Sequence, residues 1–110
     1  MSARKFDIMK NKKYGNVTIH HSQNLLSVVL HLTEVVRFDK VENKIYLSSG
    51  GWHTATTKTA LNNALRQIEG FTGQNLPSVF QKKGEWFLDN GQKFQDGMEI
   101  AVYPLLQALA

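Results

Sequence analysis

The fold of this chain is decided by residues 45–70, which read IYLSSGGWHTATTKTALNNALRQIEG. The stretch opens as a strand and passes through two glycines. From Leu61 onward apolar residues recur at i, i+3, i+4 and i+7 with polar residues between them, which predicts an amphipathic helix over residues 55–69. Gly70 stands where a left-handed glycine ends many helices. The stretch therefore predicts one strand, a glycine-rich turn and one helix.

Strands are predicted on both sides of this helix, because apolar and polar residues alternate there between turn-forming residues. The run 26–39 fits either a strand or a helix, and its β-branched valines favour two strands with a break near Thr33. An Asn-Gly pair at residues 90–91 indicates a hairpin turn. The predicted strands are residues 5–9 and 17–21 as a first hairpin, two within 26–39, then 45–47, 85–88, 92–94 and 98–103, the last ended by Pro104.

The order of these elements predicts an α+β fold. Strands precede and follow a single helix, without the strand–helix–strand alternation of a parallel sheet. We expect a single domain over residues 1–110, an antiparallel sheet of about six or seven strands, and the helix packed across one face. A strongly curved sheet or a partial barrel is the alternative form that we consider for this predicted sheet.

The positive charge of the chain is concentrated near its amino terminus. The formal net charge is +4, and residues 21–110 carry as many acids as bases, so the surplus belongs to residues 1–20. This segment is predicted to be a basic first hairpin or arm, whereas a nucleic-acid footprint over the whole domain is excluded. Its bases are Arg4, Lys5, Lys10, Lys12 and Lys13. In the alternative, these bases form an ordinary solvated surface that binds no nucleic acid.

Composition also limits the chemistry. The chain has no cysteine, which excludes disulfides, thiolate metal sites and a thiol nucleophile. Adjacent strand residues such as His20 and His21 point to opposite faces, and no other histidine or carboxylate spacing suits a metal, so we expect no metal and no cofactor. No apolar run suits a signal peptide or a membrane span, so we expect a cytoplasmic protein without a membrane partner.

The glycine–threonine segment at the predicted helix start is the candidate site. Amide groups in the first turn of a helix point outward with the positive end of the helix dipole, and glycines allow a ligand to approach the backbone closely. This favours an anion or phosphate site, although the spacing is not that of a P-loop. In the alternative, one threonine only caps the helix, the glycines form a turn, and Trp52 packs in the core. The residues concerned are Gly50, Gly51, Thr54, Thr56, Thr57 and Lys58.

Two further roles are possible for side chains near this segment. Trp52 could stack on a nucleic-acid base, which would add it to the nucleic-acid contacts. If the protein were an enzyme, His31 or His53 would be the general base, with Lys58 steadying a phosphate.

Several of these residues together resemble a family of small, mostly uncharacterised bacteriophage proteins. Their pattern is an H-x-T-x-V-V strand followed by G-G-W-x-T-x-T-T-K and an asparagine four residues on, and the likeness covers about residues 29–103. The resemblance implies a phage origin and action in a bacterial host cytoplasm, but no activity. It places shared polar residues at His31, Thr33, Thr54, Thr56, Thr57, Lys58 and Asn62, and so adds Asn62 to the candidate site.

Three functions follow from the sequence. The first is a non-enzymatic phage protein that binds nucleic acid through the basic segment and the helix-start anion site. The second is an inhibitor that binds a host enzyme or an anti-phage defence complex through apolar and aromatic anchors at Trp86, Phe87, Tyr103, Leu105 and Leu106. The third is a metal-independent phosphoesterase or nuclease.

Overall fold

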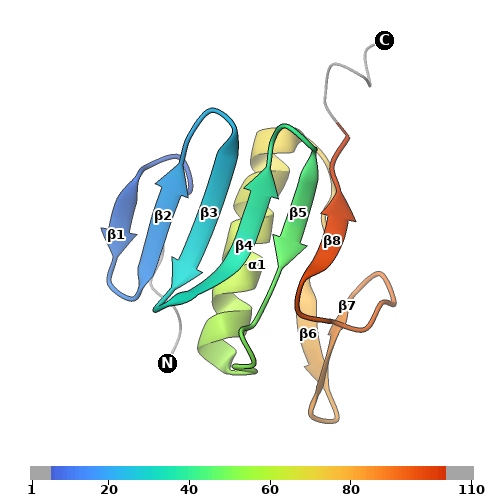
Figure 1. The fold of residues 1–110 in the computed structure, drawn as a ribbon. Coiled ribbons are helices and arrows are strands. Elements are labelled where there is room, and N and C mark those ends of the chain that lie inside the picture. The colour runs from blue at the N-terminus through green and yellow to red at the C-terminus, as the bar shows by residue number, and fades with distance from the viewer. Residues whose placement is uncertain (1–5, 104–110) are drawn as a thin grey trace.

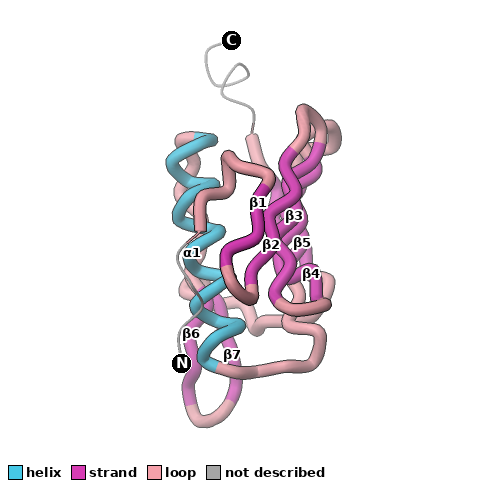
Figure 2. Tube along the Cα trace, turned by 90° about the vertical axis from the view of Figure 1, so that its left-hand side faces the viewer, coloured by secondary structure: helices cyan, strands magenta, loops and turns pink. Residues whose placement is uncertain are grey.

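A computed structural model of the chain describes residues 6–103, which form an antiparallel sheet with a helix packed against one face (Figures 1 and 2). Within these residues the sheet has six strands, in the order β1-β2-β3-β4-β5-β8. The prediction of an α+β fold is confirmed, and the sheet is open rather than closed into a barrel. Its strands are β1 (Lys12–Tyr14), β2 (Val17–His21), β3 (Leu25–Leu30), β4 (Thr33–Asp39), β5 (Lys44–Leu47) and β8 (Met98–Ala101).

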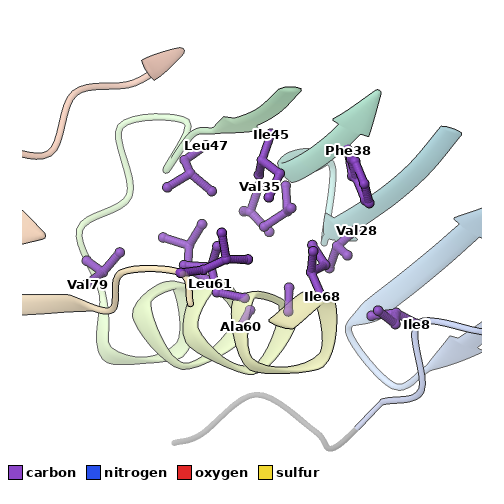
Figure 3. Close-up of a cluster of buried hydrophobic side chains, with 14 of the residues drawn as sticks. Ile8, Val28, Val35, Phe38, Ile45, Leu47, Ala60, Leu61, Ile68 and Val79 are labelled. Atoms are coloured by element: carbon purple, nitrogen blue, oxygen red, sulfur yellow. The ribbon is translucent and has the colours of Figure 1, made fainter. Parts of the chain in front are cut away.

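The second layer contains α1 (Ala55–Thr72) and a separate hairpin of β6 (Val79–Lys82) and β7 (Glu85–Leu88). The apolar stripe predicted for the helix is confirmed, since it is buried against the sheet (Figure 3). Each fully buried aliphatic side chain contributes about 1.5–3 kcal/mol to stability. The core contains the helix residues Leu61, Leu65 and Ile68 together with the sheet residues Val28, Val36, Ile45 and Leu47.

Both ends of α1 have identifiable caps. Thr54 is the N-cap, and its hydroxyl accepts a hydrogen bond from the amide of Thr57 at 3.2 Å. The prediction that Gly70 ends the helix is wrong, because the helix continues to Thr72 and Gly73 takes the left-handed conformation, with a φ of 76°. The amide of Gly73 then donates to the carbonyl of Glu69 at 2.8 Å. Within the described residues, no helix combines the length and apolar character needed to cross a membrane.

The prediction of a strand over residues 5–9 is also wrong, although its apolar residues are buried in alternation. Phe6 and Ile8 are buried as an alternating pattern requires, but their backbone pairs with a helix side chain instead of a strand. Gln67 of α1 donates to the carbonyl of Phe6 at 2.7 Å and accepts from the amide of Ile8 at 3.0 Å. The strand that forms the first hairpin with β2 is β1, which lies in the segment expected to form the turn.

The later strands follow the prediction in part. The break near Thr33 is confirmed, since β3 and β4 are joined by a turn at His31 and Leu32. The turn at residues 89–91 forms as well, but residues 92–94 contribute only a single bridge between Phe87 and Lys93. The main partner of β7 is β6, which was not predicted. Pro104, Leu105 and Leu106 lie outside the described residues, as do Arg4 and Lys5.

Candidate functional site

A pocket of about 710 Å³ lies at the end of the molecule where α1 begins. Its walls are largely apolar and come from three connections that are far apart in the sequence. These are the β1–β2 turn at Asn16, the β3–β4 turn at His31 and Leu32, and the β5–α1 connection that carries Trp52. The pocket thus brings together most of the polar residues singled out by the resemblance: His31, Thr33, Thr54, Thr56 and Thr57 all line it.

Large apolar side chains are exposed where they line this pocket. Trp52 is 66% exposed and Leu32 is fully exposed, at 100%. The alternative in which Trp52 packs in the core is therefore wrong. The prediction that Trp86 anchors an interface is also wrong, because its side chain is only 2% exposed. Tyr103, another predicted anchor, is exposed.

The threonines at the helix start are used in part by the helix itself. The Thr54 hydroxyl caps the amide of Thr57, and the two hydroxyls lie 2.9 Å apart. Thr57 is buried. The capping alternative is thus present in the structure, which leaves fewer groups at this turn for an anion.

The two glycines have hydrogen-bond partners within the chain. The amide of Gly50 donates to the Ser48 hydroxyl at 3.2 Å, and that of Gly51 to the Ser49 hydroxyl at 3.1 Å. Ser49 in turn donates to the carboxylate of Asp96, through its amide at 2.7 Å and its hydroxyl at 2.8 Å. A carboxylate beside these amides opposes an anion, so the geometry favours a turn-forming role for both glycines.

The pKa of Asp96 reflects the same contacts. Partial burial, the largest effect, raises the pKa of this carboxyl, but hydrogen bonds from Ser49 and Gly51, together with the nearby His53, outweigh it. The pKa of Asp96 therefore lies below its ordinary value, and the carboxylate stays charged at neutral pH.

Gly50 is also confined by its surroundings. Its φ is +63°, and a Cβ placed on it would lie 2.6 Å from the methyl carbon of Thr33. Only glycine fits both the left-handed backbone and the close contact. Thr33 and Gly50, both singled out from the sequence, are thus neighbours that fix the β5–α1 connection against β4.

Lys58 and Asn62 lie outside the residues that line the pocket. Lys58 is half-buried on the first turn of α1. The Asn62 side chain is occupied, because it exchanges two hydrogen bonds with the backbone of Val79 at the start of β6. The structure therefore brings Lys58 close to the helix start and gives Asn62 a role in attaching the hairpin.

The two candidate catalytic histidines lie in different surroundings. The His53 ring stacks on Trp86 at a centroid distance of 4.5 Å and an angle of 16°, whereas His31 occupies the β3–β4 turn with a φ of 56°. Among the described residues, no hydrogen bond joins His31, His53 and Lys58, and no three His, Asp or Glu side chains form a group that could hold a metal. The arrangement offers no assembled acid–base pair.

The described bases of the amino-terminal segment are exposed. Lys12 and Lys13 lie on the edge strand β1, where the Lys12 ammonium approaches the Tyr14 ring at 5.2 Å from its centroid. The strand leads directly into the turn that carries Asn16. Lys10 precedes the strand and is exposed as well.

Among the residues that line the pocket, sequence reasoning missed Leu30, Val35 and Ser49, which lie in strands or just after one, and also Asn16 and Leu32. The last two stand in short turns, where an asparagine or an isolated leucine carries no distinct signal. Their contribution arises only because the two turns meet in space, where the amide of His31 donates to the carbonyl of Asn16 at 2.8 Å.

The fold and this pocket define a small α+β protein with an open sheet and a recess at the start of its helix. The family model described as Kyanoviridae Gp96 protein matches residues 3–101, nearly the whole chain. The chain belongs to this family, which confirms the expectation of a bacteriophage protein. No curated protein and no solved structure matches it.

Proposed function

We propose that this phage protein binds single-stranded nucleic acid without acting as an enzyme, in the cytoplasm of the infected host. The observation that carries the proposal is the exposure of Trp52 beside a pocket with largely apolar walls. A tryptophan left 66% exposed forgoes most of the free energy of its burial, which a stacked base would restore. Stacking of a base on an aromatic side chain contributes about 1–3 kcal/mol.

The charges at this end of the molecule support a polyanionic partner. The tip of the β6–β7 hairpin extends to the same end as the start of α1 in both Figures 1 and 2, and it carries the exposed Lys82 and Lys83. Lys58 on the first turn of α1 and Lys13 near the β1–β2 turn add to them.

Acidic groups near these lysines are largely engaged. Glu34 pairs with Arg37 at 3.1 Å, Glu85 pairs with Lys93 at 2.9 Å, and Asp96 accepts from Ser49. The lysines are thus the groups that we assign to phosphates, in place of the glycine amides. Because each neutralised phosphate releases counterions, affinity should fall steeply with salt.

The test is fluorescence anisotropy with labelled single-stranded DNA, duplex DNA and RNA at low and physiological salt. We expect salt-sensitive binding of single strands that weakens at least about fivefold in Trp52→Ala. The matched control is Tyr103→Ala, which removes an aromatic side chain of similar exposure, 69%, beyond the end of β8. Absence of binding to any of the three nucleic acids at low salt would overturn the proposal.

One observation favours a second function, inhibition of a host protein. Leu32 is fully exposed at the pocket, and a protein partner could use the same rim as a hydrophobic anchor point. This binding would be insensitive to salt and lost in Leu32→Asp, whereas nucleic-acid binding would keep its salt dependence in that variant. Failure of the wild type to retain any host protein would count against this function, and a host partner retained equally by Leu32→Asp would place the interface away from Leu32.

A further inference from the structure

The outer face of the β6–β7 hairpin carries two aromatic side chains. Phe80 and Phe87 are direct partners across the hairpin, and their ring centroids lie 6.0 Å apart. Val79 and Leu88, the next pair along the strands, are buried in the core. Because adjacent strand residues point to opposite faces, the two phenylalanines are turned away from the core. Phe80 is 41% exposed, so its ring is accessible to a ligand.

The hairpin lies next to the connection that forms a wall of the pocket. His53 directly follows Trp52, and its ring stacks on Trp86 of β7 at a centroid distance of 4.5 Å. Trp86 is buried in the core together with Val79 and Leu88, which fixes the inner face of the hairpin. A ligand would therefore meet the outer face as a preformed surface beside the pocket.

The charge of the hairpin favours an anionic ligand. Lys82 stands two residues after Phe80 and so shares its face of the strand, and Lys83 follows at the tip. Glu85 is the only acidic residue of the two strands, and it pairs with Lys93 at 2.9 Å. Among the ion pairs within residues 6–103, none engages Lys82 or Lys83. Exposed rings and uncompensated positive charge thus occur on one surface.

Resting on the proposed function, we propose that this outer face is a second stacking site for unpaired bases of the bound strand. The bases stack on Phe80 and Phe87, and Lys82 and Lys83 contact the phosphates between them. Proteins that bind single strands combine aromatic side chains, on which bases stack, with basic side chains along the backbone. Every base has a flat face, so this site distinguishes single strands from duplexes and does not read the sequence.

A protein partner suits this face less well. Its apolar part consists of two rings, and the other strand residues on the face, Lys82 and Glu85, are charged. Lysine and glutamate are depleted at the cores of protein interfaces, whereas a site for nucleic acid requires positive charge beside its aromatic rings.

The test is fluorescence anisotropy at low salt with a labelled single-stranded DNA of about 15 nucleotides and mixed sequence. We expect Phe80→Ala to weaken binding at least about fivefold. Phe80→Trp keeps a flat ring and should bind at least as tightly as the wild type, whereas Phe80→Leu keeps only apolar surface and should lose affinity as Phe80→Ala does. The matched control is Phe71→Ala, which removes a ring of similar exposure, 49%, near the other end of α1.

A measurement on the wild type makes the result independent of how the variants fold. A strand that contains iodouracil, irradiated in complex with the protein, should crosslink to Phe80 or Phe87 as well as to Trp52. Peptide mass spectrometry identifies the crosslinked residues.

The outcomes separate this inference from the proposed function. Binding that is weakened in Trp52→Ala but unchanged in Phe80→Ala, without a crosslink to the hairpin, overturns the second stacking site and leaves the proposed function standing. Full affinity in Phe80→Leu, or an equal loss in Phe71→Ala, also overturns the site. A purified host protein that requires Phe80 for binding, while DNA affinity does not, would assign the face to a protein partner instead. Absence of binding to any nucleic acid overturns the proposed function itself.

Discussion

The side chain of Asn62 in α1 satisfies both backbone polar groups of Val79 in β6. Its Nδ2 donates to the Val79 carbonyl at 2.9 Å, and its Oδ1 accepts from the Val79 amide at 2.7 Å. One amide thereby holds the β6–β7 hairpin to the middle of the helix, which explains an asparagine at this position without any ligand.

We therefore expect Asn62→Ala to act on stability and to leave nucleic-acid affinity unchanged. Loss of the two hydrogen bonds, with one buried backbone pair left unsatisfied, should lower the free energy of unfolding by about 1–3 kcal/mol. Urea denaturation measures this, with Asn63→Ala on the same helix as the control. Reduced affinity of Asn62→Ala at full stability would instead return Asn62 to the binding site.

Substitution of Gly50 should cost more than substitution of Gly51. Both glycines have positive φ, so alanine at either position pays about 1–2 kcal/mol for the left-handed backbone. Only at Gly50 does the added Cβ also meet Thr33, whereas Gly51 faces open space. The overlap should add about 1–3 kcal/mol.

The matched design for this contact is a double-mutant cycle. Thr33→Ala combined with Gly50→Ala should recover most of the excess cost, while Thr33→Ala should not relieve Gly51→Ala. Equal losses of thermal stability in the two single glycine variants would contradict the contact between Gly50 and Thr33.

The hydrogen bonds to Asp96 predict an acid-sensitive component of stability. Because the pKa of Asp96 is lowered in the folded state, its contribution is complete above the unfolded value of about 3.9 and is lost as the pH falls through the folded value. The side chain is partly solvent-screened, so we expect at most about 1 kcal/mol. Asp96→Asn should flatten the dependence of unfolding free energy on pH below about 4.

Denaturant titrations between neutral and acid pH would measure this effect. An unchanged slope in Asp96→Asn would show that Ser49 and Gly51 do not depend on the charge of Asp96.

The lysines at the hairpin tip should determine part of the salt dependence. For single strands, log affinity falls with log salt by about 0.7 for each phosphate neutralised. The double variant Lys82→Gln, Lys83→Gln should therefore reduce the slope by about 1.4 if each lysine contacts one phosphate. Lys93→Gln is the control, because Lys93 is already paired with Glu85. An unchanged slope in the double variant would place the phosphates elsewhere.

The sequence predicted the elements whose pattern and packing agree. The helix stripe at Leu61 to Ile68 and the split of residues 26–39 were correct because local periodicity and burial coincide there. The alternation at Phe6 and Ile8 predicted burial correctly but not the partner, since the side chain of Gln67 takes the place of a strand. That substitution depends on a contact between residues far apart in the chain, which no local pattern contains.

The sequence analysis identified the segment of the chain that forms the candidate site, but not which of its side chains are exposed. The residues from Gly50 to Thr57 could be singled out because glycines and threonines cluster before a helix. The exposure of Trp52 and the burial of Trp86 could not, because the burial of a tryptophan depends on tertiary packing. The contact between the turns that carry Asn16 and His31 is likewise a tertiary property, which no local pattern contains.

The edge strand β1 has a further consequence for the protein in solution. It is only three residues long, and Lys12 and Lys13 are exposed on it. Short edge strands that carry lysines resist pairing with the edges of other sheets, because association would bring like charges together and bury them. The charge on β1 should therefore limit aggregation when the protein accumulates to high concentration, whether or not those lysines ever contact a phosphate.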